Sequence, residues 1–200
     1  MTRTITTIGP LDHGRPMSLK DFDLAEGQPG YLYELSRGVV TVMDVPNPSH
    51  FAQMIVIRNQ FATYQLAHPD RIYGVGSRAD CKILLPSLES ERHPDLSVYI
   101  TSPPRENVWS TWIPEIVIEV VSPSSKHRDY GEKAEEFFLF GVREYWIIDA
   151  AKQEMLVLRR SPEGWKERTI RPPKKYRIRL LPGFEFDCGK VFQAAQASGE

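Results

Sequence analysis

Residues Glu115 to Val121 read Glu-Ile-Val-Ile-Glu-Val-Val, and the fold prediction rests mainly on this segment. The run is β-branched and almost wholly apolar, which is typical of a strand at the centre of a sheet that is covered on both faces. Glu119 is the exception, because a buried carboxylate is unstable unless a partner offsets its charge. The stretch therefore predicts a central strand with one acid that needs a partner.

Two interpretations of Glu119 are open. An ion pair with a nearby arginine or lysine, or a place at an exposed strand end, would make it a structural residue. A divalent cation would also offset the burial cost, and carboxylate oxygens are the ligands that such hard cations prefer. We favour the metal ligand.

Helical and extended patterns surround this strand on both sides. Strands are predicted at 31–35, 38–43, 72–75, 81–85, 94–100, 144–149 and 155–159. Long helices are predicted from His50 to Leu66, with Ser49 as N-cap, and from Asp129 to Phe140, where Gly141 stops the helix. A short helix begins at Ser18.

This order predicts an α/β fold in which a mixed β-sheet is flanked by the two long helices, with extra strands near the C-terminus. We expect a single domain over residues 17–192, a flexible N-terminus over 1–16 and a frayed C-terminus over 193–200.

The composition excludes several classes of protein. With 25 basic against 26 acidic residues, the chain is not a strongly basic coat for nucleic acid, although one local basic cleft remains compatible. Cys81 and Cys188 lie far apart, which disfavours a disulfide framework or a cysteine zinc site. Neither a signal peptide nor a run of about 20 apolar residues is found. We expect a soluble, cytoplasmic protein without membrane contact.

Asp95 is a candidate metal ligand because it is expected to lie near Glu119. It opens the strand at 94–100 and shares a face with Ser97 and Tyr99. Two carboxylates on adjacent strands and on one face come within reach of a single ion. A Pro-Asp pair alone is a common turn signal, so Asp95 without Glu119 would carry no functional weight.

Lys133 lies on the apolar stripe of the second long helix, four residues before Phe137 and seven before Phe140. An inward lysine beside a carboxylate site would steady a phosphate oxygen or an attacking hydroxide. A surface salt bridge to Asp129 or Glu136 is the alternative, and the sequence leaves both open.

Six segments, in this order, resemble the Uma2 (DUF820) family of the PD-(D/E)XK nuclease superfamily, and the resemblance spans residues 17–190. The segments are Tyr33-Glu-Leu-Ser-Arg-Gly-Val-Val40, Pro48-Ser-His50, Pro94-Asp-Leu-Ser-Val98, Ile118-Glu-Val-Val-Ser-Pro-Ser-Ser125, Arg128-Asp-Tyr-Gly-Glu-Lys133 and Gly141-Val-Arg-Glu-Tyr-Trp-Ile-Ile-Asp149. Each is weak alone, whereas six in register are fairly specific.

The resemblance implies a restriction-endonuclease-like fold with Asp95 and Glu119 as the motif acids. The lysine that the superfamily places two residues after the glutamate is Val121 here, and Lys133 is the candidate for its displaced equivalent. Glu34 resembles the family's upstream acidic position and would complete the metal shell, unless it is a strand-edge charge. The main-chain carbonyl of Val120 would add a ligand.

The implied function is a metal-dependent endonuclease that hydrolyses DNA phosphodiester bonds with Mg²⁺, or with Mn²⁺ as a substitute. We expect His50, Lys126 and Arg128 to contact DNA phosphates, although a solvated helix start and a solvated loop are the alternatives. A homodimer is expected because cutting both strands needs two sites.

A different class of function stays open. The fold would also serve as a catalytically silent DNA-binding or protein-interaction module. A serine hydrolase is disfavoured, because the serines of the segment 122–125 lack a Gly-x-Ser-x-Gly elbow and an evident histidine partner.

Overall fold

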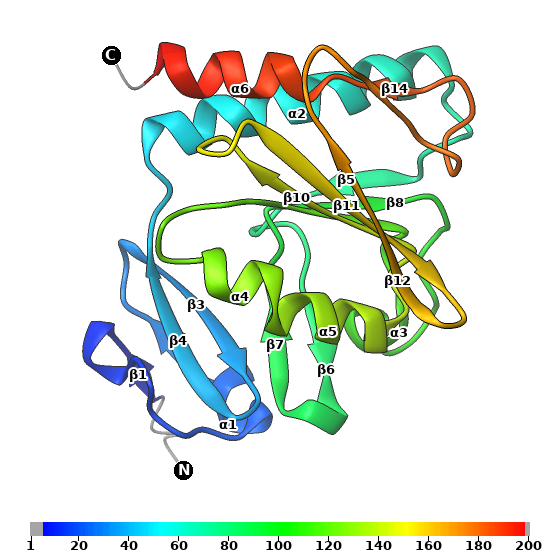
Figure 1. Ribbon diagram of the computed structural model, residues 1–200. Coiled ribbons are helices and arrows are strands. Elements are labelled where there is room, and N and C mark those ends of the chain that lie inside the picture. Colours follow the sequence, from blue (N-terminus) through cyan, green and yellow to red (C-terminus); the bar gives the residue numbers. More distant parts are fainter. Residues whose placement is uncertain (1–5, 199–200) are drawn as a thin grey trace.

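The computed structural model describes residues 6–198, which fold around a six-stranded mixed sheet in the order β12-β11-β10-β9-β8-β5 (Figure 1). The central strand β9 (Ile116–Val120) pairs in parallel with β10 (Glu144–Asp149) and antiparallel with β8 (Leu96–Tyr99). The outer strands are β5 (Gly74–Gly76), β11 (Glu154–Ser161) and β12 (Gly164–Ile170). The predicted central strand and mixed sheet are confirmed.

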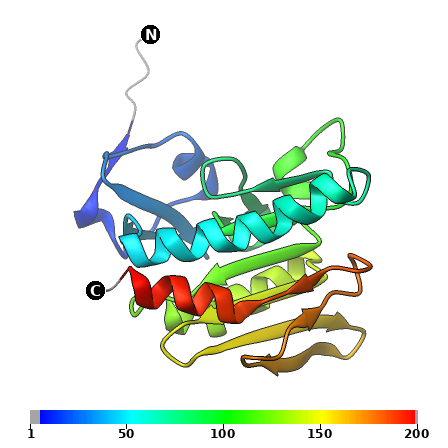
Figure 2. The same ribbon diagram turned by 90° about the horizontal axis from the view of Figure 1, so that it is seen from above.

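Helices cover both faces of this sheet. On one face, α2 (Pro48–Ala67) and α6 (Cys188–Ala197) lie side by side (Figures 1 and 2), and Phe61 and Phe192 share a buried core with Ile118. On the other face, α4 (Lys126–Tyr130) and α5 (Glu132–Phe140) pack against the sheet, with the ring of Phe137 5.0 Å from that of Tyr145. Side chains alternate along β9, so Ile118 faces α2 whereas Val117 and Glu119 face α5.

A second sheet lies on the outer side of α5 (Figure 1). Its four strands follow the order β4-β3-β7-β6. They are β3 (Tyr31–Ser36), β4 (Val39–Asp44), β6 (Ile83–Leu85) and β7 (Ser90–Arg92). Ile83 and Leu85 pack in the same core cluster as Phe137. Because α5 has a sheet on both sides, its polar residues on these sides are removed from water.

Short elements complete the described chain. They are β1 (Thr7–Ile8), η1 (Pro10–Asp12), α1 (Leu19–Asp23), β2 (Glu26–Gly27), η2 (Pro86–Leu88), α3 (Val108–Thr111), β13 (Tyr176–Arg177) and β14 (Glu185–Phe186). Ser18 caps α1 as predicted, since its hydroxyl accepts the N–H of Asp21.

Both chain ends carry more structure than expected. In the segment 1–16, β1 and η1 form, and Ile8 is buried against Phe22 and Leu35 in a small core. In the segment 193–200, residues as far as Ala197 belong to α6, because the apolar face of this helix packs beside α2. Residues 1–5 and 199–200 lie outside the described part of the chain.

Two helix boundaries also differ from the prediction. Asn47, not Ser49, caps α2, because its side-chain oxygen accepts the N–H of His50 at 2.8 Å. The helix predicted from Asp129 to Phe140 is divided into α4 and α5 at Gly131, whose φ of −117° and ψ of −90° leave the helical region.

Two further features concern membrane-spanning helices and disulfide bonds. Among the described residues, no helix combines the length and apolar character needed to cross a membrane. Cys81 and Cys188 are both free and buried.

Candidate active site

Asp95 and Glu119 lie opposite each other across β8 and β9. The register pairs Leu96 with Ile118 and Ser97 with Val117, so its continuation places Asp95 opposite Glu119 on the same face. Both side chains are buried, and Asp95 Oδ2 accepts the N–H of Val120 at 2.8 Å. The structure therefore brings the two predicted acids together where the strand pattern placed them.

Lys133 reaches this pair from α5. Its Nζ donates to Glu119 Oε1 at 2.9 Å and lies 3.3 Å from Asp129 Oδ1 and 3.8 Å from Glu34 Oε1. Burial alone would lower the pKa of Lys133, but the three carboxylates raise it above its ordinary value. The inward orientation is correct. Of the alternative ion pairs, the one with Asp129 forms but is buried and not on the surface, whereas Glu136 pairs with Arg92.

Glu34 lies on β3, on the far side of Lys133 from the strand pair. It is fully buried, so the alternative of a strand-edge charge is wrong. Its carboxylate accepts the N–H of His93 at 3.2 Å and lies 3.3 Å from Arg92 Nη1. Burial opposes ionisation, yet Lys133 and Arg92 lower the pKa of Glu34 to about 2. Its place in a metal shell stays a prediction.

Arg78 is a site residue that the sequence analysis missed. Its Nε donates to Asp95 Oδ1 at 2.7 Å, and His50 Nε2 lies 3.3 Å from the same oxygen. Although burial opposes ionisation, Arg78 and His50 hold the pKa of Asp95 well below its usual range. Arg78 belongs to the turn between β5 and β6, where no periodic pattern indicates which way a side chain points. His50, in contrast, contacts the site and is not a solvated helix-start residue.

Glu119 has the opposite electrostatic environment. Burial, together with the negative charges of Asp95 and Asp129, raises its pKa to about 8, although Lys133 and Arg78 act against this rise. Burial dominates because Glu119 is enclosed between the sheet and α5. An additional positive charge at this place would favour the ionised form of Glu119.

A pocket of about 280 Å³ opens beside the acids. His50, Arg78 and Val120, which all contact Asp95, form one part of its wall. Arg128 and the serine segment 122–125 form another part. Nε and Nη2 of Arg128 are buried and have no hydrogen-bond partner within residues 6–198. Buried donors without partners are rare, and a guanidinium group in this state suits the oxygens of a phosphate.

Lys126 is separated from the other predicted substrate contacts. Its Nζ lies 3.8 Å from Asp149 Oδ2, and its side chain is 51% exposed. It does not line the pocket that Arg128 and His50 share. Of the two basic residues predicted to contact substrate from this segment, Arg128 therefore faces the pocket and Lys126 does not.

The donor set suits a magnesium ion better than a metal that needs a cage of protein ligands. Over residues 6–198, no three or more His, Cys, Asp or Glu side chains are grouped so that they could hold a metal by themselves. Asp95 and Glu119 supply two carboxylates, next to the main chain of Val120. Mg²⁺ typically uses one or two carboxylates and completes its shell with water and substrate phosphate.

Comparisons with known proteins first define the class of fold. A solved structure described as a "putative nuclease belonging to DUF820", from Anabaena variabilis, superposes with a TM-score of 0.72. The match covers 90% of this chain and 99% of that chain at 19% sequence identity, so it shows the fold. The family model described as "Putative restriction endonuclease" matches residues 19–189, and the chain belongs to this family, Uma2. No curated protein matches the chain.

Proposed function

We propose that this protein is a metal-dependent endonuclease that hydrolyses phosphodiester bonds in DNA. The observation that carries the proposal is the juxtaposition of Asp95 and Glu119 on one face of adjacent strands, with Lys133 2.9 Å from Glu119. Two acids and a lysine supply the oxygen ligands and the positive charge that phosphodiester hydrolysis requires. Membership of Uma2 supports the class of reaction.

Asp95 and Glu119 would hold Mg²⁺, or Mn²⁺ in its place, with help from the carbonyl of Val120. The bound metal would polarise the scissile phosphate and lower the pKa of a coordinated water. Glu34 faces this centre through Lys133, so its contribution is to hold the lysine in place, and direct ligation remains a further prediction.

Lys133 would act as a donor and not as a base. Three carboxylates within 3.8 Å keep its ammonium group protonated. A fixed ammonium group next to Glu119 would orient the attacking water or offset negative charge in the transition state. Its rigid burial between two sheets serves this role, because no reorganisation is needed during the reaction.

Arg128 and His50 would bind the phosphates of the DNA strand. Both line the pocket beside Asp95, and the buried unpaired donors of Arg128 lack any other partner within residues 6–198. Lys126 would add only a peripheral charge, since it is half exposed and faces Asp149. A homodimer would present two such pockets for the two strands of a duplex, and analytical ultracentrifugation would test it.

Cleavage of single- and double-stranded DNA, with Mg²⁺, with Mn²⁺ and with a chelator, tests the proposal. We expect cleavage only with metal, and a loss of at least about 100-fold in Glu119→Gln, which keeps the shape of the side chain. Glu167→Gln is the matched control, because Glu167 is exposed on β12 and does not line the pocket.

Circular dichroism and melting curves must show that both variants are folded. Absence of cleavage by the wild type, together with no effect of metal on its melting temperature, would contradict the proposal. That outcome would leave the silent binding module as the better description.

A further inference from the structure

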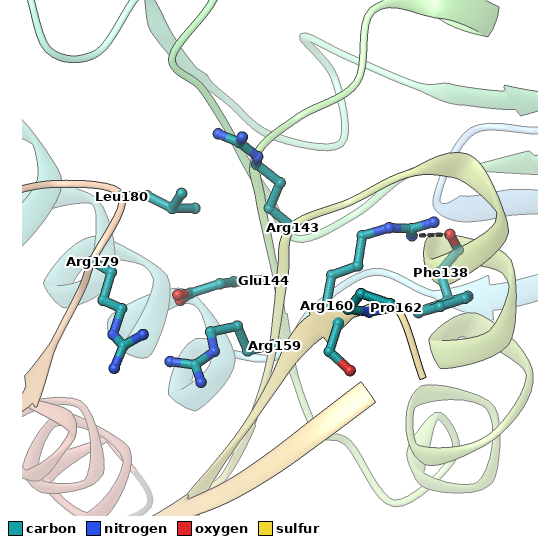
Figure 3. Close-up of a pocket in the computed structure, with 9 residues that line it drawn as sticks. Phe138, Arg143, Glu144, Arg159, Arg160, Pro162, Arg179 and Leu180 are labelled. Atoms are coloured by element: carbon teal, nitrogen blue, oxygen red, sulfur yellow. Dashed lines mark hydrogen bonds between the residues drawn. The ribbon is translucent and has the colours of Figure 1, made fainter. Parts of the chain in front are cut away.

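A larger pocket, of about 620 Å³, lies at the other end of the central strands. It is lined by Phe138, Arg143, Glu144, Arg159, Arg160, Ser161, Pro162, Arg179 and Leu180 (Figure 3). Glu144 pairs with Ile116 at the start of β9, whereas Ile147 pairs with Glu119. The offset of three residues (147 − 144) corresponds to about 10 Å along the strands. The arginine pocket, as we call this pocket, is therefore separate from the candidate active site.

Four arginines line this pocket, against one acid, Glu144. None of the guanidinium groups of Arg143, Arg159, Arg160 and Arg179 lies within the 4.0 Å of an ion pair with any acid of the described chain. Arg160 is held in place, since it donates to the carbonyl of Phe138 and stacks 4.1 Å over its ring. The accumulation of four such groups around one pocket raises a positive potential in a concave site.

Glu144 is the acid that lines the pocket, and its carboxylate is occupied. It accepts the indole N–H of Trp146 at 2.9 Å and the hydroxyl of Tyr176 at 3.1 Å. Arg159 lies directly opposite Glu144 in the register of β10 and β11, yet the two form no ion pair. Figure 3 shows Arg159 and Arg179 extending their guanidinium groups beside Glu144. Their donors are thus available to a ligand.

We propose that the arginine pocket binds a small organic anion that carries two or more phosphate groups, such as a nucleoside di- or triphosphate. Guanidinium groups bind phosphate oxygens in a bidentate way, and several of them favour clustered phosphates over a single one. The volume falls in the range of small-molecule sites, about 300–1,000 Å³. Phe138, Pro162 and Leu180 provide apolar walls for the organic part.

The backbone of a nucleic acid carries the same phosphate chemistry, and the experiment separates the two sources. Titration calorimetry in the presence of a chelator would measure binding of inorganic pyrophosphate, a purine nucleoside triphosphate and a short single-stranded DNA. The test variant is Arg159→Gln with Arg179→Gln. The matched control is Arg71→Gln with Arg105→Gln, which removes equal charge at two exposed positions outside the pocket.

We expect the test variant to lose at least about tenfold in affinity for pyrophosphate and for the triphosphate, and the control variant to bind as the wild type does. A loss confined to the DNA would support the phosphate site with a nucleic acid as the source. No binding of any probe by the wild type, or equal losses in both variants, would overturn the proposal. If the double variant fails to fold, Arg143→Gln, at an exposed position of the same pocket, replaces it.

This inference is independent of the proposed nuclease function. Glu119→Gln should bind pyrophosphate as the wild type does, and Arg159→Gln with Arg179→Gln should retain metal-dependent cleavage of DNA. Failure of one site would therefore be distinguishable from failure of the other.

Discussion

The two ends of the central strands treat charge in opposite ways. At the carboxyl end of β9, Glu119, Asp129 and Glu34 surround Lys133, and every one of these charges is buried and has an opposite charge within 3.8 Å. At the amino end, the four guanidinium groups of the arginine pocket have no such partner among the described residues. The charges at the first end are balanced by the protein itself, whereas those at the second end are open to solvent or to a ligand.

A cluster of charges indicates function only where the fold does not itself require the charges to be paired. Charges enclosed between two sheets must be paired for the chain to fold, so Lys133 has a structural role whether or not it also acts in catalysis. Charges at the rim of a pocket are solvated, and the protein can leave them unpaired at little cost. Loss of activity alone therefore does not assign a role at the buried end, where stability has to be measured as well.

The largest expected effect is the difference in stability between two variants that each lack one positive charge, one at each end of the central strands. Lys133→Met leaves three buried carboxylates without their ammonium partner and should lower the free energy of unfolding by about 3–5 kcal/mol. Arg159→Met removes an unpaired, half-buried charge and should change it by less than about 1 kcal/mol. Urea denaturation of both variants measures the difference. Similar losses in the two variants would show that the two ends do not differ as described.

A divalent metal should stabilise the protein by binding at Asp95 and Glu119, and not at the arginine pocket. At a Mg²⁺ concentration of about 100 times its dissociation constant, the wild type should gain about 2.7 kcal/mol of stability. Asp95→Asn should lose this gain, because it removes the charge of one proposed ligand, whereas Arg159→Met should retain it. Melting curves with and without Mg²⁺ measure the effect. A gain that persists in Asp95→Asn would place the metal elsewhere.

The smallest expected effect concerns Glu144 at the arginine pocket. Burial raises the pKa of Glu144 above its ordinary value of 4.5, although Trp146, Tyr176 and the nearby arginines oppose the rise. Folding therefore favours the protonated form of Glu144. The stability that this preference contributes is fully present below the pKa of Glu144 in the unfolded chain, and it is lost as the pH rises through the higher pKa of Glu144 in the folded protein.

Glu144→Gln cannot titrate and should not show this loss. As the pH is raised from the pKa of Glu144 in the unfolded chain toward neutrality, the wild type should therefore lose unfolding free energy relative to Glu144→Gln. Denaturation over that pH range measures it. A difference that is constant with pH would contradict the raised pKa.

Much of the candidate site follows from short-range periodicity. The alternation of a strand places Asp95 on the same face as Ser97, and the helical repeat places Lys133 above Phe137. Arg78 and Arg92 carry no comparable signal, since one lies in a turn and the other in a strand of three residues. The break at Gly131 and the helix α6 were also missed, because a short segment without its packing partner has little preference of its own.

Sequence patterns were enough to predict the central strand, the two acids that meet beside it, the inward lysine and the family. The folded structure was needed to show which charges are paired. Arg78 pairs with Asp95, and Glu34 pairs with Arg92 and Lys133, whereas no acid of residues 6–198 pairs with the four arginines near the amino end of β10. The physical reason is that periodicity determines the face on which a side chain lies, whereas an ion pair depends on which distant segment packs against that face.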